Sequence, residues 1–276
     1  MKLSKTALTL GFNLLAFEAC SAAFGLNEHS ASGLGRAFAG EGAISDNAAV
    51  LARNPAAMTR FRQAEVSLVG TAIGPDVSLE GSSNSELDED SIAPDALIPA
   101  LYYIQPLNKS FAVGFGAFSN FGLSTELPED YAAGQLAGET SLTTININAS
   151  AAIRLNKYLS LGLGANLVYA DATLIRHFGA NSLGLDRDTE AANMTGDDIG
   201  YGFNVGLLYE INRDHRVSLA YRSEVDLMLS GDYSNELPAS FGGLDGESLA
   251  GELEITLPAM AELSGVHQLT DNLAMH

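Results

Sequence analysis

One segment of the chain, 158–176, combines an apolar surface with a single cation. As a strand, it would carry small and polar residues and then an apolar patch on one face, which ends at Arg176. Burying each CH₂ group of a ligand is worth about 0.8 kcal/mol, and a buried carboxylate needs a cation or hydrogen-bond donors. This face therefore suits a fatty acid. The alternative is an arginine at the strand end paired with an acid such as Asp186. The residues of the face are Gly162, Gly164, Asn166, Val168, Ala172, Leu174 and Arg176.

The other reactive side chains do not indicate catalysis. The five histidines show neither metal-ligand spacing nor a paired nucleophile, and Cys20 is the single cysteine. The segment SGLGRAFAG, 32–40, superficially resembles a glycine-rich phosphate loop, but it lacks a preceding strand and a Gly-Lys pair. We therefore expect no enzymatic activity, no metal site and no cofactor.

Long amphipathic strands would position the face described above. In 145–155 the odd positions, beginning with Ile145, are apolar, and most even positions, beginning with Asn146, are polar. The alternation resumes in 159–169, which predicts a hairpin with one apolar and one polar face. Arms of ten or more residues can cross a bilayer as tilted strands. A soluble sandwich strand usually stops after about 5–6 residues, so we favour a lipid-facing barrel.

The rest of the chain repeats this pattern. From Ala64 onward we count eight strands and the start of a ninth at Leu273, joined alternately by short polar turns and longer loops. No run of about 18 apolar residues follows the N-terminal segment, which excludes an ordinary helical membrane protein. The net charge of −20 argues against nucleic-acid binding, which needs a cationic surface for the phosphates. Because an open sheet edge cannot face lipid, we expect further C-terminal strands beyond this sequence.

Two N-terminal segments differ from the strands. Residues 1–23 have a basic end, an apolar stretch and small residues at 20–23, which predicts a cleaved secretory signal. Residues 24–63 are rich in Ala and Gly and do not alternate. We expect a compact, partly helical segment that needs a cavity to occupy, with one helix capped by Asp46 and another starting at Asn54-Pro55. The predicted division is therefore 1–23, 24–63 and a truncated barrel, 64–276.

Residues 26–61 closely resemble the N-terminal hatch of the FadL family of long-chain fatty acid transporters in Gram-negative outer membranes. The most specific pieces are SGLGRA at 32–37, GEGA at 40–43 and NPA at 54–56. The resemblance implies an all-β fold, a transmembrane antiparallel β-barrel of fourteen strands with a small helical N-terminal hatch that plugs the lumen. The hatch and gating residues expected from it are Gly33, Gly35, Arg36, Asn54, Pro55 and Ala56.

The same resemblance implies a binding pocket and a lateral exit. Family members hold hydrophobic substrate in an apolar pocket and release it sideways at a kinked strand. Asn120, Phe121 and Gly122 match that kink, and a strand glycine alone would allow a bend. A plain strand end is the alternative. Phe24 and Phe118 are expected in the pocket, and Arg176 matches a pocket arginine; a merely buried plug residue is the alternative for Phe24.

The resemblance implies passive, hatch-gated uptake of long-chain fatty acids across the outer membrane of a Gram-negative bacterium. The alternatives are an uptake channel for aromatic or alkane hydrocarbons and a structural or adhesive surface barrel that acts through its acidic loops. The expected partners are hydrophobic small molecules, outer-membrane lipids and lipopolysaccharide, with no nucleic acid, and the protein is expected to be a monomer.

Overall fold

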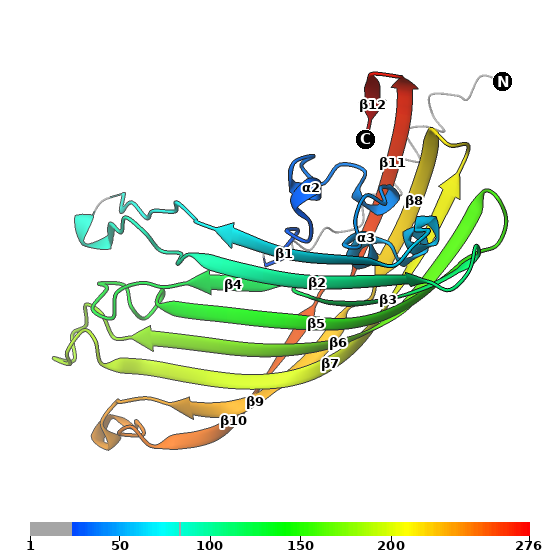
Figure 1. Ribbon diagram of the computed structural model, residues 1–276. Helices are drawn as coiled ribbons and strands as arrows, with labels where there is room; N and C mark the ends of the chain where they lie inside the picture. Colours follow the sequence, from blue (N-terminus) through cyan, green and yellow to red (C-terminus); the bar gives the residue numbers. More distant parts are fainter. Residues whose placement is uncertain (1–23, 83) are drawn as a thin grey trace, which may run out of the picture.

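The computed structural model describes residues 24–82 and 84–276, so the predicted signal peptide lies outside the described residues. Twelve strands form one antiparallel sheet, with short helices near the N-terminus and in two loops (Figure 1). No helix in this part of the chain is long and apolar enough to cross a membrane. The strands are β1 Glu65–Ile73, β2 Ala96–Pro106, β3 Phe111–Phe118, β4 Gly122–Thr125, β5 Glu139–Arg154, β6 Leu159–His177, β7 Glu190–Glu210, β8 His215–Arg222, β9 Val225–Ser234, β10 Ser248–Leu257, β11 Met260–Thr270 and β12 Leu273–Met275. The helices are α2 Ala31–Leu34, η1 Glu41–Ala43, α3 Val50–Arg53, η2 Pro55–Arg60, η3 Ser85–Leu87 and η4 Ala239–Phe241.

β5 and β6 form the long hairpin that the alternation predicts. Their register pairs Ile145 with Tyr169 and Asn148 with Asn166. Ile145 is 47% exposed, whereas Asn148 is fully buried. In 145–167 of the hairpin the apolar side chains therefore point out of the curved sheet, and the polar side chains point into it.

Three of the expected strands are each broken into two pieces. β3 and β4 both pair with β5, and β8 and β9 both pair with β7. β10 and β11 continue beside β9 and β8, with a break at Pro258, which has no N–H for the ladder. If each broken pair is counted as one strand, the sheet has eight strands followed by β12, which confirms the predicted count.

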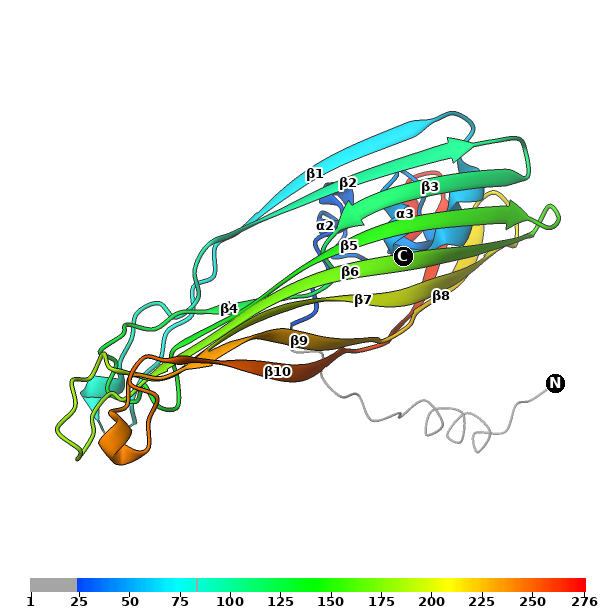
Figure 2. The ribbon, with the colours of Figure 1, turned by 90° about the horizontal axis from the view of Figure 1, so that it is seen from below.

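The sheet is curved and open. Among the described residues, β1 pairs with β2 alone and β12 pairs with β11 alone. The strands curve so that β1 and β11 lie on opposite sides of the interior (Figure 1), and the same curvature is visible from below (Figure 2). Long loops gather at one end of the strands and short turns at the other, which confirms the predicted alternation of short turns and longer loops (Figures 1 and 2).

Residues 24–63, which we call the hatch, lie on the concave side of the sheet (Figure 1). We call the curved sheet the wall. The main buried cluster joins Leu51 and Met58 of the hatch to Tyr102, Ile104 and Leu208 of the wall, all with 0% exposure. Burying one such side chain contributes about 1.5–3 kcal/mol. Apolar contacts therefore supply much of the free energy that holds the hatch in place.

One of the two predicted helix starts in the hatch is correct. Asn54 caps η2, because its side chain accepts a hydrogen bond from Ala56 N, and Pro55 is the first residue of the helix. The cap predicted at Asp46 is wrong. α3 begins at Val50, and the side chain of Asn47 accepts from Ala49 N at 2.8 Å. Asp46 instead forms an ion pair with Arg36 at 2.9 Å.

Candidate binding site, side gap and hatch

A small hollow of about 250 Å³, which we call the apolar hollow, opens on the inner face of the sheet near the long loops. It is bounded by β4–β7, β9 and β10, and by Phe24 at the start of the hatch. Ala172 and Leu174 line it, as their inward positions on β6 predict. No Lys, Arg or His is among the described residues that line it, whereas Asp232 and Glu252 do so. The arrangement can hold a hydrocarbon chain.

Arg176 lies beside the apolar hollow but does not line it. Its guanidinium donates to the carbonyl oxygens of Glu139 and Ile175, both at 2.7 Å, and to Thr140 Oγ1 at 2.9 Å. Thr140 in turn lines the hollow. Among the described residues Arg176 has no carboxylate partner, so the ion pair with Asp186 is not formed. Its role as a carboxylate ligand stays a prediction.

Two other residues predicted for the pocket lie deeper in the interior. Val168 is buried in a cluster with Phe121 and Leu142. Phe118 is 1% exposed and packs against Tyr102 of the wall and His29 of the hatch, with ring centroids 5.4 and 5.5 Å away. The structure therefore brings Phe24, Ala172 and Leu174 together, whereas Val168 and Phe118 do not line the hollow.

The strand break at 119–121 coincides with the predicted kink. Phe118 pairs with Asn146 and Gly122 pairs with Thr143, so three residues of the broken strand face two of β5. This extra residue is a β-bulge, which bends a strand. The start of the hatch runs along the break: Leu26 N donates to Asn120 O at 2.7 Å, and Gly122 N donates to Phe24 O at 2.9 Å. The hatch thus satisfies backbone groups that the kink leaves unpaired.

The wall has a gap beside the same kink. β2 pairs with β3 only from Leu101 onward, and β4 pairs with β5 alone, so residues 96–100 have no strand partner on that side. A hollow of about 640 Å³, which we call the side gap, occupies this place. Its lining includes Leu97 and Ile145, both exposed on the outer face, together with Leu26 and Phe121 from inside. The side gap therefore lies between the interior and the apolar outer surface.

Phe24 links the apolar hollow to the kink. Its ring lines the hollow and packs edge-on against Phe121, with the ring centroids 6.0 Å apart and an interplanar angle of 62°. Its carbonyl oxygen accepts the hydrogen bond from Gly122 of the kink. A displacement of Phe24 from the hollow would therefore also disturb the backbone pairing at the kink.

The NPA segment of the hatch rests on glycines of the wall. Asn54 is fully buried, and its amide donates to Gly42 O at 2.9 Å and to Leu207 O of β7 at 3.3 Å. A Cβ atom on Gly206 would lie 1.9 Å from Asn54 Oδ1, and one on Gly162 would lie 2.3 Å from Ala56 N. Only a wall without side chains at these two paired positions allows this close contact.

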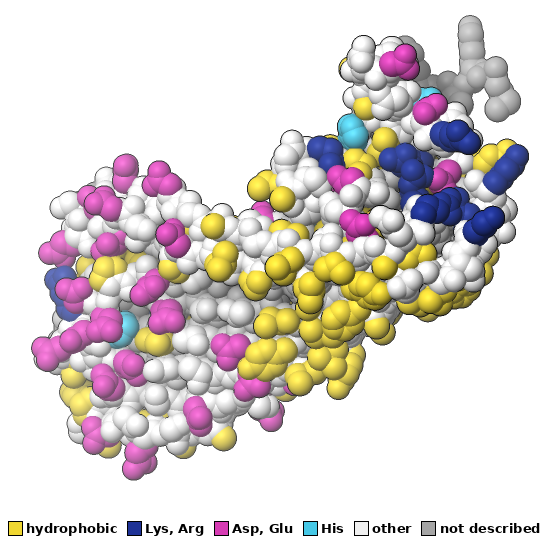
Figure 3. All heavy atoms as spheres, in the orientation of Figure 1, with side chains coloured by type: hydrophobic (Ala, Val, Ile, Leu, Met, Phe, Trp, Pro, Cys, Tyr) yellow, Lys and Arg dark blue, Asp and Glu magenta, His cyan; other side chains and the backbone are white. Residues whose placement is uncertain are grey.

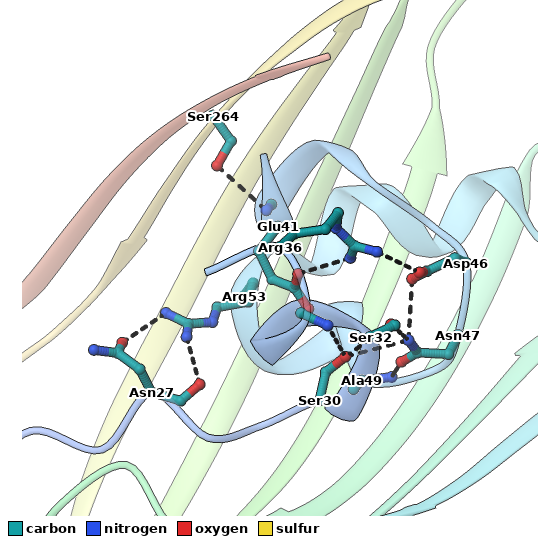
Figure 4. Close-up of polar contacts among 12 residues, drawn as sticks. Asn27, Ser30, Ser32, Arg36, Glu41, Asp46, Asn47, Ala49, Arg53 and Ser264 are labelled. Atoms are coloured by element: carbon teal, nitrogen blue, oxygen red, sulfur yellow. Dashed lines mark hydrogen bonds and ion pairs between the residues drawn. The ribbon is translucent and has the colours of Figure 1, made fainter. Parts of the chain in front are cut away.

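A polar network fixes the rest of the hatch (Figure 4). Arg36 forms ion pairs with Glu41 at 3.0 Å and Asp46 at 2.9 Å. Ser30 caps α2 by accepting from Gly33 N, and a Cβ atom on Gly33 would collide with the Glu41 carboxylate at 2.6 Å. Gly35 ends α2 without any such close contact. These contacts give physical reasons for glycine at position 33 and arginine at position 36.

Sequence reasoning missed a buried polar ladder between hatch and wall. Asn120, Asn146, Asn148, Asn166 and Asn204 hydrogen-bond to one another through their amides. The inward positions of Asn146 and Asn148 on β5, Asn166 on β6 and Asn204 on β7 could be predicted from the strand alternation, but alternation alone does not show that their amides pair.

An arginine of the wall and a histidine of the hatch hydrogen-bond to this asparagine ladder. Arg222, 9% exposed, donates to Asn166 Oδ1 at 2.7 Å and to Ala52 O of the hatch at 2.8 Å. His29 of the hatch contacts Ser119 O at 3.2 Å and the Asn120 amide at 3.3 Å. His29 thus makes a second contact between hatch and kink. Its position just before the SGLGRA segment at 32–37 gave no indication of this contact.

Comparison with known proteins gives one consistent result. Residues 12–276 match the family described as "Outer membrane protein transport protein (OMPP1/FadL/TodX)". The chain is 39% identical to the long-chain fatty acid transport protein of Escherichia coli K12, over 99% of this chain and 69% of that protein. It is 42% identical to the 47 kDa outer membrane protein of Pasteurella multocida, over 100% of this chain and 68% of that protein.

Solved structures share the fold. A Pseudomonas aeruginosa FadL homologue superimposes with a TM-score of 0.75 at 20% identity, covering 91% of this chain and 67% of that one. The Pseudomonas putida toluene transporter TodX gives 0.55 at 18% identity, covering 82% and 64%. Fold, family match and curated relatives agree, and the chain belongs to the FadL family of outer-membrane transport proteins.

Proposed function

We propose that this protein takes up long-chain fatty acids through the outer membrane and releases them sideways at the kink. The observation that carries the proposal is the double contact of Phe24, which lines the apolar hollow and accepts a backbone hydrogen bond from the kink. A chain that enters the hollow competes with the Phe24 ring. Loss of that ring from the hollow frees residues 24–26 from the strand break.

The energetics are compatible with such an exchange. Each buried CH₂ group of cargo is worth about 0.8 kcal/mol, whereas each backbone hydrogen bond to the kink contributes about 0.5–1.5 kcal/mol net. A few methylene groups therefore offset the two hydrogen bonds of Leu26 and Gly122. The side gap then offers a path to the apolar outer face at Leu97 and Ile145.

The proposal extends to the setting of the protein. We infer export by a signal peptide at 1–23, a hatch at 24–63 and a barrel wall from 64 onward. The exposed apolar band would contact outer-membrane lipids, and the acidic loop end would face lipopolysaccharide. We also propose that the protein functions as a monomer, because residues of this one chain line both the apolar hollow and the side gap. The further C-terminal strands expected from the sequence stay a prediction.

A reversible disulfide across the kink tests the mechanism. Gly25 and Phe121 are β-bridge partners, and the Cα separation of such partners suits a disulfide. In a Cys20→Ser background, oxidised Gly25→Cys/Phe121→Cys cells should lose uptake of labelled oleate and regain it after reduction. The matched control is Thr71→Cys/Ile98→Cys, which joins two paired residues of β1 and β2. Undiminished uptake with the kink disulfide formed would refute lateral release.

Uptake of neutral hydrocarbons is the second candidate, and it has one specific observation in its favour. Arg176 is tied to its own wall, and no cation lines the apolar hollow among the described residues. Binding of a fatty acid and of its methyl ester to the wild type and to Arg176→Ala separates the candidates. A carboxylate ligand at Arg176 predicts that the variant weakens only the acid; equal binding in all four cases favours neutral cargo.

A further inference from the structure

The cations of this acidic chain concentrate at the end of the short turns. Lys and Arg side chains gather there, whereas Asp and Glu dominate the opposite, long-loop end (Figure 3). A hollow of about 540 Å³ opens among these cations, and we call it the basic hollow. The five cations that line it are Arg60, Arg62, Arg154, Lys157 and Arg213, and Glu210 is the one carboxylate.

The floor of the basic hollow is built from fixed charges. Glu210 of β7 accepts from Arg154 of β5 at 2.6 Å and also from Arg60 at the end of the hatch. Arg154 also donates to Thr59 O of the hatch at 3.1 Å. The side chains of Arg60, Arg154 and Glu210 are 26%, 17% and 12% exposed. Two arginines on one carboxylate leave the floor with an excess positive charge.

The rim carries three more cations. Arg62, Lys157 and Arg213 have no carboxylate within ion-pair distance among the described residues, and all three are exposed. With one acid against five cations, the lining has a net charge of +4. In a chain with a net charge of −20, this is a local reversal of sign that attracts anions.

The depth of the basic hollow in the membrane indicates which anions it can meet. Tyr158 lines the hollow, and its ring lies 6.3 Å from that of Tyr209 on the outer face. Lys157 Nζ lies 4.6 Å above the Tyr158 ring. Tyrosines of this kind mark the membrane–water interface of a barrel, and short turns face the periplasm. The cations therefore lie at the depth of the headgroups of the periplasmic leaflet.

From this geometry we infer that the basic hollow binds a phosphate group, as the headgroup of an anionic phospholipid or as soluble phosphate. A phosphate presents several acceptor oxygens, which suits converging arginine and lysine donors. The single carboxylate of Glu210 is already shared by the floor arginines, so the rim cations remain for the ligand. The site is distinct from the apolar hollow and does not depend on the cargo.

Native mass spectrometry of the detergent-purified protein tests the inference. Binding of phosphatidylglycerol is compared with binding of phosphatidylcholine of the same acyl chains. The site variants are Lys157→Gln and Arg213→Gln, and the matched control is Arg187→Gln, which also loses one charge but lies in a long loop at the opposite end of the strands. A cation near a membrane surface contributes about fivefold to binding an anionic lipid, so each site variant should bind phosphatidylglycerol about fivefold more weakly. The control should stay within twofold of the wild type.

Two further measurements complete the test. Lys157→Arg/Arg213→Lys keeps the charge and should keep the binding. Inorganic phosphate that displaces phosphatidylglycerol in the wild type identifies soluble phosphate as the ligand, whereas lack of displacement identifies the lipid headgroup. Equal binding of the two lipids without phosphate binding, or equal weakening in the site and control variants, would overturn the inference.

Discussion

Replacing Gly206 by alanine should dislodge the hatch. The new Cβ atom would lie 1.9 Å from Asn54 Oδ1 and 3.0 Å from Pro55 Cδ. Asn54 is fully buried and holds Gly42 O, Leu207 O and Ala56 N by its side chain. Relief of the collision requires a movement of about 1 Å or more, because ordinary contacts lie at about 3.5 Å. Such a movement stretches all three hydrogen bonds.

The magnitude follows from the two effects. Overpacking a close contact costs about 1–3 kcal/mol, and each strained hydrogen bond adds about 0.5–1.5 kcal/mol. We expect docking of the hatch to weaken by about 3 kcal/mol, near the lower end of the combined range because the hydrogen bonds are strained and not lost, which is a rise of about 150-fold in the undocked population. Hydrogen exchange at the amides of η2 measures that population directly.

The control for this experiment lies on another strand. Gly70 of β1 has no heavy atom within 4 Å of an added Cβ, so Gly70→Ala should leave exchange in η2 unchanged. Gly162→Ala, whose Cβ would approach Ala56 N, should behave like Gly206→Ala. Identical exchange in Gly206→Ala and Gly70→Ala would refute the close packing of hatch on wall.

Other predictions concern the polar contacts of the hatch. Burial, with Arg53 and Arg222 acting in the same direction, holds the pKa of His29 well below its ordinary 6.5. In the undocked hatch His29 is protonated below about pH 6.5, whereas in the docked hatch it stays neutral. Docking should therefore weaken as the pH falls below 6.5. His29→Gln should remove most of that pH dependence in an exchange titration of η2, and an unchanged slope would contradict it. Arg222→Lys should weaken docking of the hatch by about 1–3 kcal/mol, because Ala52 O loses a buried donor. The rate of protease cleavage within 24–63 measures this effect. A variant that resists the protease as well as the wild type would contradict the prediction.

Much of the wall could be predicted because a β-strand alternates strictly. The outward Ile145 and the inward Asn148 follow from period 2 alone. The break at Gly122 was also within reach, because glycine in an alternating strand marks a bend. The break between β8 and β9 was not, since Ser223 and Glu224 are neither glycine nor proline.

The binding site was harder to predict, because the alternation along a strand fixes the face on which a side chain lies but not the groups that it contacts. Arg176 has inward parity, yet neighbouring carbonyl groups take its donors. Phe118 also has inward parity, but it packs on the hatch residue His29, a contact between segments far apart in the sequence. Ala37 and Phe38 have positive φ values of 50° and 61°, which are uncommon for residues other than glycine and leave no sequence pattern.

Photo-crosslinking of a fatty acid that carries a diazirine near its methyl end tests most directly whether cargo occupies the apolar hollow. With the label bound to the purified protein, we expect mass spectrometry to find adducts on lining residues such as Leu174 and Leu229, and excess oleate should abolish them. Adducts confined to outward side chains such as Leu163 and Tyr201, or adducts in the hollow that oleate does not reduce, would contradict binding of cargo inside the wall.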